Sequence, residues 1–207
     1  ATASVSSVDS TVASVTASKA ATDAGPGQTF NMTQGVDAIV GTVGDDAINS
    51  FVDGGVSTFN ALDTVDGAGG TDTLTILGAD LDSITEANVT NVEKLVVQST
   101  AAGSVDLSLI TGVTSITAQN DSNAATYNNI AAGTALSALG QAAVTTTFNF
   151  GASVWSGASD AVTLNLNAAL GRIDITGSVA TTNALETLTI NSTGALSTLT
   201  TLTNIAG

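Results

Sequence analysis

Aspartates and glycines that recur together are the residues of this sequence best suited to chemistry. Nine of the 18 acidic residues lie between Asp37 and Asp82, and the segment DTVDGAGGTDTL at 63–74 places three aspartates around three glycines. Calcium takes six to eight oxygen ligands, typically carboxylates and carbonyls. Glycine lets backbone carbonyls turn toward an ion at low steric cost. The segment therefore suits calcium, although an acidic turn whose side chains bond their own backbone has the same composition.

A nine-residue spacing organises these aspartates. Asp37 and Asp46 are nine residues apart, as are Asp63 and Asp72, and each is followed two residues later by an aliphatic residue. A ligand repeated in register would stack ions along a solenoid, so we expect Asp63 and Asp72 to occupy successive turns of one ladder. The segments GTVGDDAIN (41–49) and GAGGTDTLT (67–75) match the calcium-binding nonapeptide G-G-x-G-x-D-x-U-x, except at its second glycine.

A longer period of 21 residues points to the elements that position them. LTI at 74–76 is followed by LVV at 95–97 and ITA at 116–118. The chain is 43% hydrophobic but only 3% aromatic, so β-branched and small residues must build its core. Short strands at such steps favour a mainly β fold, a parallel β-solenoid or β-roll of stacked strands. The alternative is a β-sandwich, whose strands recur at shorter intervals.

Two segments stand outside this period. AAGTALSALGQAA at 131–143 interrupts it, and we expect a short helix or a loop there. Near the start, Val5, Val8, Val12 and Val15 would share one face of a short N-terminal helix, which would need a partner surface. The alternative is a low-complexity linker. We therefore divide the chain into residues 1–27, the N-terminal segment or linker, and 28–207, the solenoid domain, whose acidic glycine-rich part spans 35–75.

Charge and composition exclude several classes of function. The net charge of −15 argues against nucleic acid and anionic membranes as partners. The absence of Cys and His excludes disulfides, Cys/His zinc sites and imidazole catalysis. No apolar run reaches the ~20 residues of a membrane span. Lys94 beside Glu93, and Arg172 beside Asp174, read as solvated pairs, and the lone Trp155 as a core or capping residue. We expect no enzyme activity.

Three segments together carry a family resemblance: GQTFNMTQGVDAIVGTVGDDAINSF, LDTVDGAGGTDTLTI and NVEKLVV. In this order they resemble the repeats of RTX-type bacterial surface-layer proteins and related large secreted calcium-binding surface proteins. The resemblance covers residues 27–97 well, and the remainder only through its L-x-L strands. The sequence begins without methionine and ends in mid-pattern at TLTNIAG, so we expect a fragment of a longer chain.

The resemblance implies a secreted, right-handed parallel β-solenoid at the extracellular cell surface. Its function would be structural, as a subunit of a surface-layer lattice or matrix that binds copies of itself and cell-surface polysaccharide. Calcium would stabilise folding and assembly. The alternative is a calcium-dependent adhesin or glycan-binding module of a large secreted protein. Thr42 and Ala68 replace the second glycine of the motif. The calcium ligands carried over from the motif are Asp37, Gly44, Asp45, Asp46, Asp63, Asp66, Gly70 and Asp72.

Overall fold

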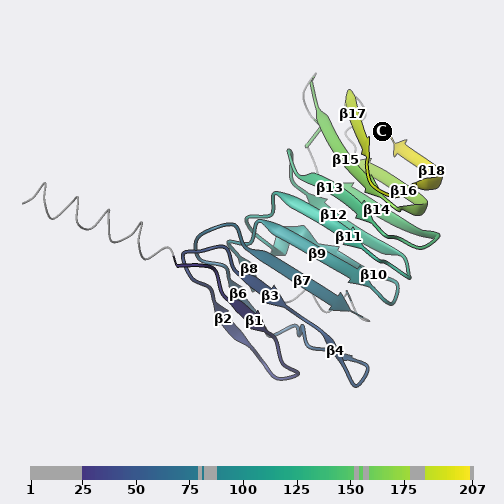
Figure 1. Ribbon diagram of the computed structural model, residues 1–207. Coiled ribbons are helices and arrows are strands. Elements are labelled where there is room, and N and C mark those ends of the chain that lie inside the picture. The colour runs from purple at the N-terminus through teal and green to yellow at the C-terminus, as the bar shows by residue number, and fades with distance from the viewer. Residues whose placement is uncertain are drawn as a thin grey trace, which may run out of the picture.

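The chain forms a parallel β-solenoid, as the computed structural model shows (Figure 1). The mainly β prediction is therefore confirmed, and the β-sandwich alternative is wrong. The predicted N-terminal helix lies outside the described residues. No helix in the described part is long and apolar enough to cross a membrane. The structure describes residues 25–78, 81, 88–151, 154–155, 159–177 and 185–205.

An eight-stranded parallel sheet, which we call the main sheet, runs the length of the stack (Figure 1). Each of its strands comes from a successive pass of the chain around the solenoid. Its strands are, in spatial order, β1 (Thr29–Asn31), β3 (Ala47–Asn49), β7 (Thr73–Gly78), β9 (Lys94–Ser99), β11 (Ser115–Gln119), β13 (Ala135–Leu139), β15 (Ala161–Asn167) and β17 (Thr187–Ser192).

Two further parallel sheets complete the passes. A three-stranded sheet serves the first part of the chain and a five-stranded sheet serves the remainder. A short antiparallel hairpin, β4 (Val52–Asp53) with β5 (Val56–Ser57), projects from the second pass. The strands of the three-stranded sheet are β2 (Ala38–Val40), β6 (Thr64–Asp66) and β8 (Asn88–Thr90). Those of the five-stranded sheet are β10 (Gly103–Asp106), β12 (Ala125–Ile130), β14 (Val144–Phe150), β16 (Leu170–Gly177) and β18 (Thr198–Ile205).

The 21-residue period corresponds to the register of the main sheet. Leu74 lies beside Leu95, and Leu95 beside Ile116, and all three side chains are fully buried. Alternate residues of each strand point inward, so one aliphatic column forms the centre of the core. Trp155 is also buried, with its ring centroid 5.2 Å from that of Phe150, which confirms its place in the core.

The expectation of a helix or loop at 131–143 is wrong for its central part. Residues 135–139 form β13, which pairs with β11 on one side and β15 on the other. Leu136 and Ala138 are fully buried there, in register with Ile116 and Ala118. Alanine and leucine favour helices in isolation, but stacking on the preceding strand decides the conformation here.

Tight turns between strands depend on left-handed backbone conformations. Asn120 has φ of 52° and Gly140 has φ of 63°, each directly after a main-sheet strand. Asparagine and glycine tolerate this region. Ala68 and Ala168 also adopt it, with φ of 68° and 52°. The Cβ of an L-residue costs roughly 1–2 kcal/mol there, so Ala68 occupies a position whose backbone favours the missing motif glycine.

We predict that Ala68→Gly and Ala168→Gly each stabilise the protein by about 0.5–1 kcal/mol. The gain is the relief of the left-handed cost, less the extra entropy of glycine in the unfolded chain. Denaturant unfolding would measure it. Ala161→Gly, at an exposed position in β15, is the control and should destabilise by a similar amount. A loss of stability in both turn variants would contradict the prediction.

Candidate calcium-binding edge

A column of acidic side chains lies where the chain enters the main sheet. Asp46, Asp72 and Glu93 each directly precede a strand, namely β3, β7 and β9, and we call them the acidic ladder. The N–H of Asp46 donates to Oδ1 of Asp72 at 2.7 Å, and the N–H of Asp72 donates to Oε2 of Glu93 at 2.8 Å. The N–H of Gln28 donates to Asp46 in the same way. Each carboxylate therefore binds the backbone of the preceding pass.

Asp37 and Asp63 form a second column, at the three-stranded sheet. They precede β2 and β6, and the N–H of Asp37 donates to Oδ1 of Asp63 at 2.8 Å. This corrects the expectation that Asp63 and Asp72 occupy successive turns of one ladder. The nine-residue step carries the chain from one sheet to the other within a single pass, whereas hydrogen-bonded aspartates are 26 residues apart.

Most of these carboxylates are saturated by donors. Both oxygens of Asp46 accept hydrogen bonds from Thr42, through its N–H and its hydroxyl. Burial raises the pKa of Asp46, but the hydrogen bonds from Gln28 and Thr42 outweigh it, so its pKa is lowered overall. Asp37 is held similarly by the N–H and hydroxyl of Thr33. These aspartates therefore cap backbone groups.

Asp72 differs from the other aspartates of the two columns. Its side chain is 1% exposed, and Oδ2 has no hydrogen-bond partner. The corresponding donor, the N–H of Ala68, bonds Oδ1 of Asp66 instead at 2.9 Å. Burial raises the pKa of Asp72, and the charges of Asp46, Glu93 and Asp45 raise it further against the hydrogen bond from Asp46. Asp72 therefore presents a buried oxygen with unused capacity for a cation or a proton.

The glycines of the motif allow successive passes to approach closely. A Cβ at Gly67 would overlap the carbonyl oxygen of Asn91 and lie 2.5 Å from Oδ2 of Asp72. Gly70 has φ of 119°, and a Cβ there would lie 2.6 Å from the carbonyl of Gly44. Gly44 and Gly70 thus stack on one another, and Gly67 lets its own backbone pack directly against Oδ2 of Asp72 and the carbonyl of Asn91.

The predicted calcium ligands lie along two columns and not around one point. Within the described ranges, no three acidic side chains converge on one metal position. Both oxygens of Asp63 accept N–H groups, from Asp37 and Asn60. One oxygen of Asp45 accepts the N–H of Thr71. Among the described residues of the two columns, Oδ2 of Asp72 is therefore the oxygen left for a cation, whereas the hydrogen-bonded oxygens of Asp45 and Asp63 hold backbone N–H groups.

Sequence reasoning missed two acidic groups of the same kind. Glu93 completes the ladder, and its signal was its position two residues before Leu95 and 21 residues after Asp72. Further along, the N–H of Asp160 donates to Oε2 of Glu186 at 2.7 Å, directly before β15 and β17. Arg172 and Asp174 form the predicted ion pair at 2.8 Å, but it is solvated on one side only, since the side chain of Arg172 is 48% exposed and that of Asp174 is 12% exposed.

A buried polar cluster inside the solenoid was also missed. Asp121 is 1% exposed; it accepts the N–H of Ser99 at 2.6 Å and the amide of Gln141 at 3.2 Å. Gln141 also donates to the hydroxyl of Thr146. The nearby Tyr127 hydroxyl and the Gln141 carbonyl oxygen have no hydrogen-bond partner in the structure. Burial raises the pKa of Asp121 to about 6, although the bonds from Ser99 and Gln141 oppose the shift.

Comparisons with protein-family models, with curated proteins and with solved structures returned no match for this chain.

Asp46→Asn should destabilise the protein by about 1.5–3 kcal/mol. The variant replaces a charged group that accepts several hydrogen bonds with an amide. The NH2 group of this amide is itself a donor and would face the N–H donors that bond Asp46. Asp53→Asn, on the exposed hairpin, removes the same charge and should change stability by less than about 0.5 kcal/mol. Chemical unfolding of the two variants checks this, and equal losses would show that charge rather than capping matters.

Asp121 should make stability fall as pH rises between about 4 and 6. Its folded pKa of about 6 exceeds the usual 3.8, so the folded state keeps a proton that the unfolded state has released. The stabilisation is fully present below the pKa of the unfolded state. It is lost as pH rises through the pKa of the folded state, and the total loss is up to about 3 kcal/mol. The stability of Asp121→Asn should therefore rise relative to that of the wild type as pH rises.

Asp106→Asn is the matched control for this titration. Hydrogen bonds from Asn129 and Ser108 lower the pKa of Asp106, so its contribution is present at neutral pH and lost on acidification. The stability of this variant relative to the wild type should fall as pH rises, opposite to Asp121→Asn. Unfolding curves between about pH 4 and pH 7.5 measure the Asp121 effect, and curves between about pH 2 and pH 4 measure the Asp106 effect, because the Asp106 pKa lies below 3.8. A relative stability of Asp106→Asn that rises with pH in its own window would refute the assignment.

Proposed function

We propose that this chain is a structural part of a secreted cell-surface assembly, a lattice or matrix subunit whose role is self-association rather than turnover. The observation that carries the proposal is the acidic ladder. Its carboxylates join successive passes of the chain through backbone hydrogen bonds at 2.6–2.8 Å. Carboxylates that a catalytic site would leave free for substrate here accept backbone N–H groups and hold one pass on the next.

Outward-facing side chains support the same conclusion. The amide of Asn191 donates to the side chain of Asn165 at 3.0 Å, and Asn149 donates to Asn128 at 3.2 Å. These pairs lie on neighbouring strands of the main and five-stranded sheets. Side-chain ladders of this kind, added to continuous parallel pairing, stiffen a solenoid along its axis. Stiffness suits a structural subunit.

Calcium is the proposed stabiliser of the folded subunit, and Asp72 is the residue that would hold it. A bound divalent cation would neutralise the charge that Asp72 shares with its acidic neighbours, in a chain of net charge −15. Binding to the folded state alone stabilises it, by about 2.7 kcal/mol when the cation is at a hundred times its Kd.

Calcium should therefore raise the thermal midpoint by roughly 5–10 °C over chelator. Calcium should also increase particle size, seen by sedimentation and by electron microscopy. Asp72→Asn should remove the thermal response, while Asp53→Asn should keep it, because Asp53 lies on an exposed hairpin. Magnesium serves as the control for ionic strength.

Three outcomes would count against parts of this proposal. A thermal midpoint that is the same in calcium and in chelator would show that calcium does not stabilise the protein. A monomer at all concentrations, with and without calcium, would oppose a lattice role. A monomer that binds cell-surface polysaccharides on a glycan array would favour the adhesin instead.

A further inference from the structure

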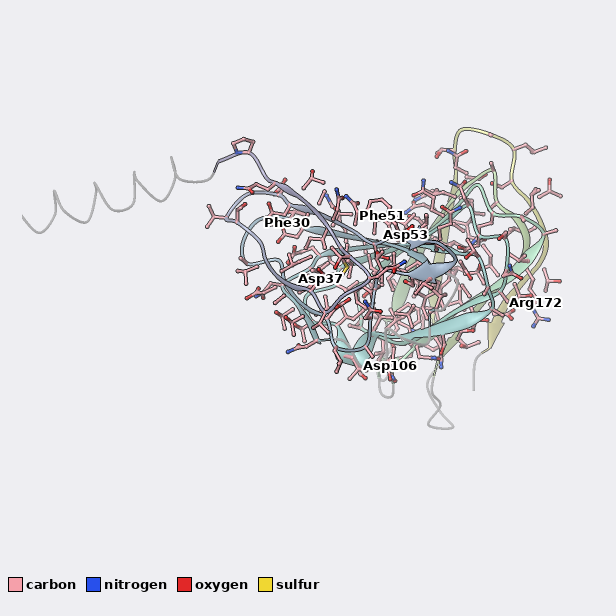
Figure 2. The ribbon with its side chains drawn as sticks, turned by 90° about the horizontal axis from the view of Figure 1, so that it is seen from below. Phe30, Asp37, Phe51, Asp53, Asp106 and Arg172 are labelled. Atoms are coloured by element: carbon pink, nitrogen blue, oxygen red, sulfur yellow. The ribbon has the colours of Figure 1, made fainter. Side chains whose placement is uncertain are left out.

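The outer face of the main sheet is almost uncharged in a strongly acidic chain. Its eight described strands contain no acidic residue, and Lys94 is their one charged residue. The five-stranded sheet, by contrast, carries Asp106, Arg172 and Asp174, and Figure 2 shows Asp106 and Arg172 at the periphery of the molecule. Two copies of net charge −15 repel one another, so a contact between copies costs least where no acids meet.

One line of side chains, which we call the polar column, crosses all eight strands of this face. Its members share one register position, are half-buried or exposed, and all but one carry a hydroxyl or an amide. The order of these groups reads almost the same from either end, with two asparagines, then a hydroxyl, then two β-branched residues at the centre. The column is, in spatial order, Asn31, Asn49, Thr75, Val96, Thr117, Ser137, Asn165 and Asn191.

Hydrogen bonds hold the asparagines at both ends of the polar column in place. The amide of Asn49 donates to the side chain of Asn31 at 3.4 Å, as that of Asn191 does to Asn165 at 3.0 Å. Side chains that are already ordered lose less conformational entropy when a partner binds. The column is therefore organised for contact before any partner arrives.

We propose that the polar column is the surface on which a second copy docks, face to face, with the two solenoid axes antiparallel. A two-fold axis along the strands, between β9 and β11, places Asn49 opposite Asn165 of the second copy and Thr75 opposite its Ser137. Each group then meets one of its own chemistry, as a two-fold interface requires. Lys94 lies opposite a serine, Ser115, which is its own register partner, so no like charges meet.

This inference rests on the proposed function, in which the partner is another copy, and it assigns the face used for one of the contacts. Eight strands span about 34 Å along the stack, and a six-residue strand such as β7 is about 20 Å long. Because β1 and β3 are shorter, the face offers roughly 600 Å² per copy, below the roughly 800 Å² of a standard interface. Such a contact is weak by itself, which suits a subunit held by several contacts at once.

Charge variants at two facing positions test the contact. Thr75→Glu with Ser137→Glu sets like charges opposite one another, whereas Thr75→Lys with Ser137→Glu sets opposite charges there. Sedimentation in calcium should give a dissociation constant at least about tenfold weaker for the first variant, and one within about threefold of the wild type for the second. Thr126→Glu with Thr145→Glu adds the same charge to the five-stranded sheet and should leave the constant unchanged.

The same measurement separates this contact from the proposed function. A wild type that assembles, with all three variants assembling equally well, would overturn the contact and leave the proposed function standing. A wild type that stays monomeric at every concentration would overturn both.

Cross-linking tests the antiparallel arrangement, because the chain has no cysteine. Asn49→Cys and Asn165→Cys lie five strand spacings apart within one copy, about 24 Å. A bifunctional maleimide shorter than this distance should link neither variant by itself, and should give a product of twice the chain mass when the two are mixed. A linked product from Asn49→Cys alone would place the same strands of two copies opposite one another and overturn the arrangement.

Discussion

Register between successive passes is the constraint on which this structure depends. In a parallel ladder a slip of one residue would move every inward side chain to the outer face. The column that includes Ile48, Leu74, Leu95 and Ile116 resists such a slip, because each member is fully buried against the next. The acidic ladder fixes the same register at the point where the strands begin, through hydrogen bonds from backbone N–H groups.

Stacked carboxylates would repel one another at the spacing of neighbouring strands, about 4.8 Å. The structure tolerates them because a backbone N–H faces each carboxylate from the preceding pass, and dipoles of that kind stabilise the ionised form. In Asp46 the hydrogen bonds outweigh the effect of burial on the pKa, whereas in Asp72 burial and the neighbouring charges outweigh the hydrogen bond from Asp46. The difference traces to the residue four positions earlier, threonine in one pass and alanine in the other. Asp72 therefore lacks both donors that Thr42 gives to Asp46, since alanine has no hydroxyl and the N–H of Ala68 bonds Asp66.

The sequence predicted the fold better than the site. The step from Leu74 to Leu95 is visible as a period, and it became the register of the main sheet. The nine-residue spacing of the aspartates was equally visible. One sequence cannot show whether such a step leads to the next pass or to another sheet within the same pass. Asp121 could not be found either, because its burial depends on Gln141, which lies 20 residues away. Side-chain saturation depends on contacts between passes, which periodicity does not encode.

The passes of the solenoid differ in length although their strands remain in register. Leu95 and Ile116 are 21 residues apart, whereas Leu136 and Leu164, also direct neighbours, are 28 apart. The additional residues lie between β14 and β15, outside the ladder. Loop length is thus uncoupled from the strand pairing that stabilises the fold. Such a scaffold can acquire or exchange surface loops over evolution, or accept grafted peptides in the laboratory, while its repeating frame stays intact.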